Sequence, residues 1–233
     1  MIKRTNDSVP TVAPTAARTP ARMAVPVGFW LAFILFTVAV DTIDREAIGP
    51  NGSIVGLATM NRAAFELLGS RPFWYALTDW LGLVPVAVAC GFACLGAWQL
   101  VRRRALRRVD ADILTLGAFY LAVVGCYVLF ERLVVNYRPI LIGGLLEASY
   151  PSSHTMVAVG VMATAVMQFR RRTRSRRPLL ALESASAAGV AVTALGRLVS
   201  GAHWLSDIIG GLLLGSALAA SYRAALARRR SVS

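Results

Sequence analysis

The sequence contains few of the residues that build metal centres, disulfide frameworks or acidic surfaces. Its 233 residues include only 2 histidines and 3 cysteines, and 12 acidic residues stand against 25 basic ones. Cys90, Cys94 and Cys126 all lie in apolar stretches, and none is spaced from a histidine as metal ligands are. We therefore expect no disulfide framework, no metal and no cofactor, and we interpret the cysteines as small apolar packing residues.

Apolar residues, by contrast, are abundant. They make up 56% of the chain and give a mean hydropathy of +0.59, too high for an ordinary soluble domain. A helix needs about 20 mainly apolar residues to cross a membrane, and six stretches qualify, at roughly 26–43, 81–101, 113–130, 155–169, 179–199 and 208–222. They predict an all-α polytopic membrane protein, a six-transmembrane-helix bundle over residues 25–227, between a disordered basic tail at 1–24 and a basic tail at 228–233.

The net charge of +13 is compatible with nucleic-acid binding, but the distribution of the basic residues favours a membrane protein. They gather near the N-terminus, at 102–108, at 170–177 and near the C-terminus. With six spans and a cytoplasmic N-terminus, all four groups face the cytoplasm, as basic residues of short membrane loops do. We expect both termini in the cytoplasm and no nucleic-acid partner, while a role of the arginines in holding anionic membrane lipid stays open.

Two further segments have alternative interpretations. Residues 57–68, after a Gly-Pro-Asn-Gly turn, show apolar residues at helical spacing. They predict an amphipathic helix that lies in the outer membrane interface, packs over the bundle, or does both. Gly211 and Gly215 form a pair of small residues four apart, which serves either dimerisation or, more commonly, close packing within one bundle.

The first histidine stands directly before an apolar stretch, in Tyr150-Pro151-Ser152-Ser153-His154. Proline directs the chain into a turn, and Ser152 is a good helix N-cap. The free N–H groups of the helix's first turn then form a site for an anion, with His154 beside it. Taken alone, the segment is equally consistent with a capped helix that begins with an interfacial histidine.

The second histidine lies in Arg197-Leu-Val-Ser-Gly-Ala-His203-Trp-Leu-Ser-Asp207. His203 and Asp207 are four apart and share a face of a helix, so the carboxylate can hold one ring nitrogen and leave the other as a nucleophile; a purely structural pair is the alternative. Gly201 provides a break that brings Arg197 back to the same pocket, and guanidinium groups suit phosphate. In the six-span topology these residues, His154 and Arg138 all lie at the non-cytoplasmic side.

Together these segments resemble the type 2 phosphatidic acid phosphatase and vanadium haloperoxidase superfamily. Its motifs K-x6-R-P, P-S-G-H and S-R-x5-H-x3-D match Arg138-Pro139, the segment that ends at His154, and the segment from Arg197 to Asp207. The resemblance implies that His203 attacks phosphorus to form a phosphohistidine, that Asp207 orients it, and that His154 protonates the leaving group. It further implies, without any metal, a set of phosphate-binding groups: Arg138, Arg197, and Ser152 and Ser153 with their backbone N–H groups.

The chain departs from the family pattern at three positions. Glu131 stands where the family has lysine, and the next residue, Arg132, is a candidate replacement on a different face of the helix. Ser153 replaces glycine but can still donate its backbone N–H, and Gly196 replaces serine and removes a hydroxyl. These changes bear on affinity and specificity more than on the type of reaction.

The sequence thus predicts a multi-pass membrane phosphatase that acts on a lipid phosphate at the non-cytoplasmic side. Candidate substrates are undecaprenyl diphosphate, which we favour, phosphatidic acid and phosphatidylglycerol phosphate. Two alternatives stay open: a phosphotransferase with an acceptor other than water, and a non-catalytic membrane protein that binds lipid phosphate. The haloperoxidases of the superfamily are soluble, so the apolar spans disfavour that branch.

Overall fold

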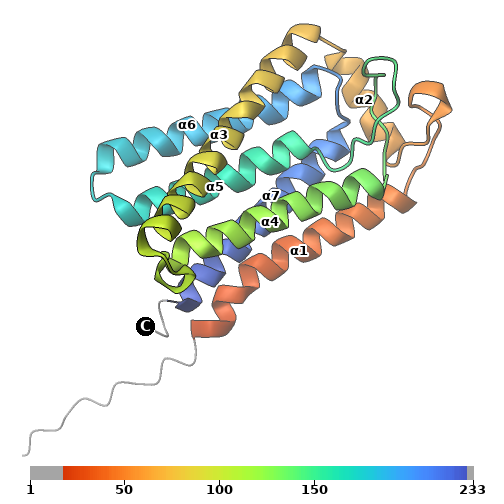
Figure 1. Ribbon diagram of the computed structural model, residues 1–233. Coiled ribbons are helices and arrows are strands. Elements are labelled where there is room, and N and C mark those ends of the chain that lie inside the picture. Colours follow the sequence, from red (N-terminus) through yellow and green to blue (C-terminus); the bar gives the residue numbers. More distant parts are fainter. Residues whose placement is uncertain (1–17, 230–233) are drawn as a thin grey trace, which may run out of the picture.

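The computed structural model describes residues 18–229, and this part of the chain is helical throughout, apart from connections and three isolated bridges (Figure 1). The predicted all-α class is confirmed. Helix α1 begins at Arg18, inside the segment predicted to be a disordered tail; residues 1–17 and 230–233 lie outside the described residues. The α-helices are α1 (Arg18–Thr42), α2 (Ala58–Leu68), α3 (Pro72–Arg103), α4 (Ala111–Arg132), α5 (Ser153–Arg172), α6 (Arg176–Val199) and α7 (Leu205–Arg229), and two 3-10 turns are η2 (Pro50–Gly52) and η3 (Leu106–Arg108).

Five of the described helices, α1, α3, α4, α6 and α7, are long and apolar enough to cross a membrane. Helix α5, which covers the predicted span 155–169, is not among them, so the count of six is not confirmed. Its interior carries buried polar side chains such as Thr164 and Gln168, and it ends in Arg170, Arg171 and Arg172. Because α5 packs against α3, α6 and α7, protein covers the side chains of Thr164 and Gln168.

Helix α7 is the centre of the bundle, whereas α3 lies at its outside. Within their apolar stretches, 67% of α7 is buried but only 6% of α3. A Cβ atom added to Gly211 or Gly215 would come within 2.7 Å of the Ser152 carbonyl oxygen or 2.8 Å of that of Met156. The glycine pair therefore serves close packing of α7 against α5, as the more common of its two interpretations predicted.

The cysteine interpretation is wrong for two of the three residues. Cys90 and Cys94 are free and exposed on the outer surface of α3, and only Cys126 on α4 is partly buried. Their side chains face the surroundings of the bundle because α3 contributes little to its core.

The two ends of the bundle differ in character. In Figure 1 the α3–α4 and α5–α6 connections lie at the same end as the start of α1 and the C-terminus. The opposite end carries α2 and the segments 133–152 and 200–204, which contain most of the predicted site. The helical topology thus brings the site segments together and separates them from the arginine-rich connections.

Helix α2 covers the site end of the bundle, as one of its two predicted placements has it. Asn61 is fully buried; its amide donates to Ser206 Oγ at 2.9 Å and its carbonyl oxygen accepts from the Ser206 backbone N–H at 3.0 Å. These paired bonds fix the beginning of α7, where the second predicted motif lies.

Candidate active site

His203 lies in the turn between α6 and α7. Helix α6 ends at Val199, and Gly201 has φ +73°, a left-handed conformation that glycine adopts without strain. The predicted break at Gly201 is confirmed. The predicted continuous helix from His203 to Asp207 is wrong, because α7 begins only at Leu205; Asp207 reaches back to the histidine from the first turn.

The hydrogen bonding of the His203 ring fixes which nitrogen is free. Nδ1 lies 3.1 Å from the Ser149 carbonyl oxygen and 3.6 Å from Asp207 Oδ2, so the hydrogen bond goes to Ser149. Since a carbonyl only accepts, Nδ1 carries the proton and Nε2 the lone pair. Burial, and then the charges of Arg138 and Arg197, lower the pKa of His203 well below its usual value. The ring is therefore neutral, with Nε2 available as a nucleophile.

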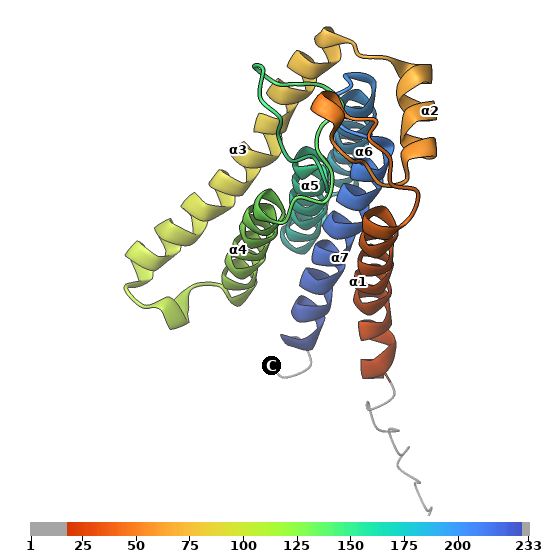
Figure 2. The same ribbon diagram turned by 90° about the vertical axis from the view of Figure 1, so that its right-hand side faces the viewer.

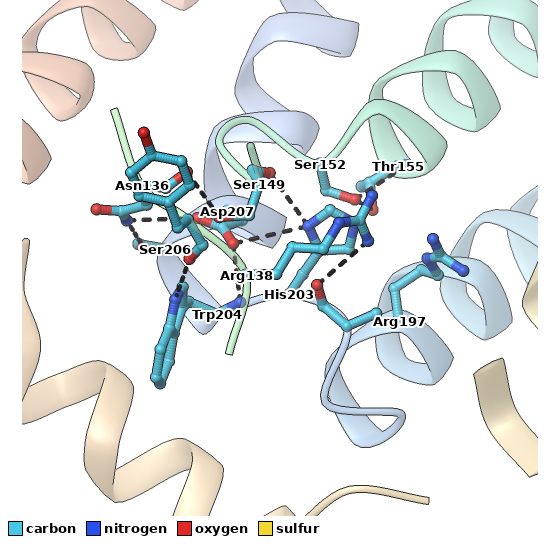
Figure 3. A network of polar contacts seen from close by, with 12 residues as sticks. Asn136, Arg138, Ser149, Ser152, Thr155, Arg197, His203, Trp204, Ser206 and Asp207 are labelled. Carbon is cyan, nitrogen blue, oxygen red and sulfur yellow. Dashed lines mark hydrogen bonds and ion pairs between the residues drawn. The ribbon is translucent and has the colours of Figure 1, made fainter. Parts of the chain in front are cut away.

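Asp207 is fully buried and serves more than one neighbour. Its Oδ2 accepts from the Trp204 backbone N–H at 2.8 Å, which caps the start of α7, and the Asn136 amide lies 3.4 Å from its Oδ1 (Figure 3). Asn136, which the sequence did not single out, also accepts from the Gly56 backbone N–H at 3.0 Å. These bonds hold the carboxylate rigidly beside the His203 ring.

Arg197 approaches the site from the last turn of α6. Its side chain is 1% exposed; one guanidinium nitrogen is 2.7 Å from Asp79 Oδ1, and the group lies 4.9 Å from the centre of the Tyr75 ring. A Cβ atom on Gly196 would come within 2.5 Å of Thr78 Cγ2. The glycine that replaces the family's serine thus permits the close approach of α6 and α3 that places Arg197 on Asp79.

His154 stands in the first turn of α5, and its Nε2 lies 3.5 Å from the same Asp79 oxygen. Asp79 therefore joins His154 to the buried Arg197. Asp79 was not predicted as a site residue, because it lies two residues before the predicted span 81–101. A carboxylate at the edge of an apolar helix is a functional signal, and it was available in the sequence.

The two serines of the first motif have different surroundings. Ser152 is fully buried, and its hydroxyl accepts from the Thr155 backbone N–H at 3.5 Å, so the predicted N-cap is confirmed. The Thr155 hydroxyl also lies 3.1 Å from it. Ser153 instead lines the site cavity together with Arg138 and His203.

Arg138 comes from the segment that connects α4 and α5. Its Nε is 3.0 Å from Glu147 Oε2 without hydrogen-bond alignment, and NH1 donates to the Ala202 carbonyl oxygen at 3.4 Å. Glu131 and Arg132 are both exposed, but only Glu131 lines the cavity with Arg138 and His203. The structure thus places the glutamate, rather than the neighbouring arginine, beside the site.

Four buried nitrogens of the predicted site residues have no aligned hydrogen bond, although Arg138 Nε is close to Glu147. Of the seven buried side-chain nitrogen and oxygen atoms that lack one in the described part of the chain, four belong to predicted site residues: Arg138 Nε, His154 Nδ1, Arg197 Nε and His203 Nε2. Buried polar groups are otherwise almost always paired. Two arginines near a neutral imidazole are suited to hold a phosphoryl group at Nε2. No group of three metal-ligating side chains occurs within residues 18–229.

Comparison with known proteins agrees with this geometry. The model of the PAP2 superfamily matches residues 139–231, which include His154, Arg197, His203 and Asp207. The fold is similar to the crystal structure of a transmembrane PAP2 type phosphatidylglycerolphosphate phosphatase from Bacillus subtilis, with a TM-score of 0.59 and 16% sequence identity over 88% of this chain and 98% of that one. No curated protein sequence gives a significant match. Residues 139–231 thus match the PAP2 superfamily, and the chain has a fold similar to that of a membrane PAP2 phosphatase.

Proposed function

We propose that this protein is a membrane phosphatase that removes phosphate from a lipid at the non-cytoplasmic side, through a phosphohistidine on His203. The observation that carries the proposal is the grouping of two arginines and two histidines at one end of the bundle. His154 Nδ1, Arg197 Nε and His203 Nε2 are buried without a hydrogen-bond partner, and Arg138 Nε has only the misaligned pair with Glu147. A phosphoryl group supplies an oxygen for Arg197 Nε and competes with Glu147 for Arg138, and its phosphorus is an electrophile for the lone pair of His203 Nε2.

The proposed reaction has two displacements. His203 Nε2 forms a bond to phosphorus while the bond to the lipid oxygen breaks, and His154 gives a proton to that oxygen. Arg138 and Arg197 stabilise the charge that develops on the phosphoryl oxygens. Water then attacks the phosphohistidine, His154 takes up the proton of that water, and free phosphate and neutral His203 are regenerated.

The membrane arrangement that accompanies this proposal has six spans, with α5 as the sixth. A helix enclosed by α3, α6 and α7 does not need an apolar surface to cross a membrane, and its 20 residues are sufficient in length. The four arginine-rich segments then lie in the cytoplasm together with both termini. Leu145→Cys and Ser175→Cys, in a cysteine-free background, test this: an impermeant thiol reagent should label only Leu145→Cys in intact cells.

The proposed substrates are lipids that bear a terminal phosphate or diphosphate. Phosphatidylglycerol phosphate is the substrate that the name of the Bacillus subtilis protein gives, and phosphatidic acid and undecaprenyl diphosphate offer the same terminal group. We favour undecaprenyl diphosphate. Transfer of the phosphoryl group to an acceptor other than water would use the same first displacement.

The test is a panel of these lipids presented to the purified protein in mixed detergent micelles, with phosphate release measured in excess chelator. Release that persists in chelator and stops with vanadate, which occupies a phosphate site as a transition-state analogue, supports a metal-independent phosphatase. Loss of release on chelation, restored by a divalent cation, contradicts metal independence. Binding of the lipids without phosphate release or transfer contradicts the enzyme and favours a lipid-phosphate-binding protein.

A further inference from the structure

An apolar cavity of about 440 Å³ lies between α3 and α4. Its walls include Phe92, Gly96, Leu100, Leu106, Gly117 and Leu121. Of these, Leu100, Leu106 and Leu121 are 40%, 60% and 75% exposed, so the cavity opens on the outer surface of the bundle. Figure 2 shows the cause: α3 leans away from α5 and α7 as it approaches the α3–α4 connection.

The cavity is far from the proposed site of catalysis. It lies along residues 92–100 of α3, beyond the middle of that helix, whereas Asp79 stands near the beginning. On α4 it covers residues 113–121, whereas Glu131, which lines the catalytic cavity, stands at the other end. A molecule bound between α3 and α4 at this level therefore does not present its headgroup to His203.

The cavity reaches the arginine-rich connection through Leu106 and Val109. Arg104, Arg107 and Arg108 are exposed around this part of the chain. The nearest carboxylate, Asp110, is already engaged: Arg103 donates to it at 2.6 Å and the Gln99 amide at 2.8 Å.

Asp112, the next carboxylate along the chain, pairs with Arg172 at 3.1 Å and Arg171 at 3.7 Å. In the described part of the chain no acidic side chain forms an ion pair with Arg104, Arg107 or Arg108. Positive charge without a counter-ion therefore stands at the mouth of an apolar cavity.

We propose that this cavity binds one anionic phospholipid of the cytoplasmic leaflet, with an acyl chain between α3 and α4 and the phosphate among the three arginines. An acyl chain matches the apolar walls, and basic pockets at helix ends bind anionic headgroups. A second copy of this chain is a poor occupant in the parallel orientation that one membrane imposes. It would bring the same arginines to the same level, and like charges repel.

The experiment measures binding of phosphatidylglycerol and of phosphatidylcholine to the purified full-length protein by native mass spectrometry. Gly117→Leu fills the cavity, since a Cβ atom at Gly117 meets nothing within 4 Å. Gly125→Leu is the matched control: it is on the same helix, has equally open space and lies outside the cavity lining. Arg107→Gln with Arg108→Gln removes two charges, and Arg174→Gln with Arg176→Gln removes two at the α5–α6 connection.

We expect the wild-type protein to retain one phosphatidylglycerol. Gly117→Leu should weaken its binding roughly tenfold or more, and Gly125→Leu should leave the binding unchanged. The double substitution at Arg107 and Arg108 should weaken the binding of phosphatidylglycerol about thirtyfold and leave the binding of phosphatidylcholine unchanged. The control substitutions at Arg174 and Arg176 should have little effect on either lipid. Equal binding of the two lipids by the wild type, or equal loss in each variant and its control, overturns the proposal. If Gly117→Leu does not fold, the arginine pair and its control decide alone. None of these outcomes depends on phosphatase activity.

Discussion

Asp79→Asn tests whether the carboxylate that joins Arg197 and His154 organises the site. The substitution keeps the shape of the side chain but removes the charge that faces the buried guanidinium at 2.7 Å and the imidazole at 3.5 Å. The side chain of Arg197 is 1% exposed, whereas that of Asp79 is 44% exposed, so solvent partly screens the charge of Asp79.

The magnitude follows from this asymmetry. Loss of one partner of a fully buried ion pair costs about 3–5 kcal/mol, and an exposed pair contributes about 0–1 kcal/mol. A pair with one buried and one half-exposed partner lies between these limits, at about 2 kcal/mol, which corresponds to a roughly thirtyfold decrease in kcat/KM if the cost falls on the transition state.

The assay compares a lipid phosphate with nitrophenyl phosphate. Because Asp79 contacts His154, the proposed general acid, its loss should slow the lipid more than the aryl ester, whose leaving group needs little protonation. Asp41→Asn is the control, since Asp41 pairs with Arg45 at 3.4 Å on the exposed surface of the same end of the bundle. Wild-type kinetics in Asp79→Asn, or an equal decrease in Asp41→Asn, refutes the argument.

Three further predictions concern the residues around His203. Arg138→Ala should reduce kcat by at least about 100-fold, because it removes a donor to the charge of the transition state; Arg132→Ala, on an exposed residue, should retain activity, and the reverse result would exchange their roles. Glu147→Gln should lower the inhibition constant of vanadate up to about fivefold by releasing Arg138 from a half-exposed pair. Glu183→Gln is the control, because its partner Arg170 lies at the other end of the bundle. An unchanged vanadate inhibition constant in Glu147→Gln would contradict the idea that Glu147 competes with the anion for Arg138. Because burial lowers the pKa of His203, its ring should stay neutral as the pH falls through 6.5, the usual imidazole value. Below that pH the unfolded chain takes up a proton that the folded chain does not, so the contribution of His203 to the free energy of unfolding decreases as the pH falls. Nitrogen NMR of an untagged His154→Gln protein, in which His203 is the sole histidine, measures this directly, and a midpoint at or above 6.5 contradicts it.

The parts of the site that the sequence predicted are those with a local signal. Ser152 stands between a proline and an apolar stretch, and the structure confirms it as the N-cap of α5. Gly201 breaks the chain between Arg197 and His203 as its residue type suggests. In each case the relevant partners are within a few residues, so local chemistry decides the conformation.

The parts that the sequence did not predict depend on contacts over long separations. Asp79 meets Arg197 across 118 positions, and Asn136 meets Asp207 across 71. The hydrogen bond of His203 Nδ1 goes to a backbone carbonyl, that of Ser149, which no side-chain pattern reveals. The neighbouring carboxylate in the sequence, Asp207, was the natural candidate for that bond, but it serves chiefly to cap α7.

The membrane spans show the same division. Hydropathy identified the helices whose sides face outward, such as α3 and α4, because those surfaces must be apolar. Helix α5 has buried polar residues and glycine, and its surface is matched to neighbouring helices rather than to lipid. Length and hydropathy therefore do not identify α5 as a membrane span.

The most direct test of the proposed chemistry is rapid-quench trapping of radiolabelled phosphate on the protein during turnover. The free Nε2 of His203 predicts a label that is stable to base and labile to acid. The label should disappear in His203→Ala and persist in His154→Ala when the substrate has a good leaving group. A label that survives in His203→Ala and vanishes in His154→Ala would show that the two histidines have the opposite roles. Turnover without any label in the wild type would contradict the covalent mechanism.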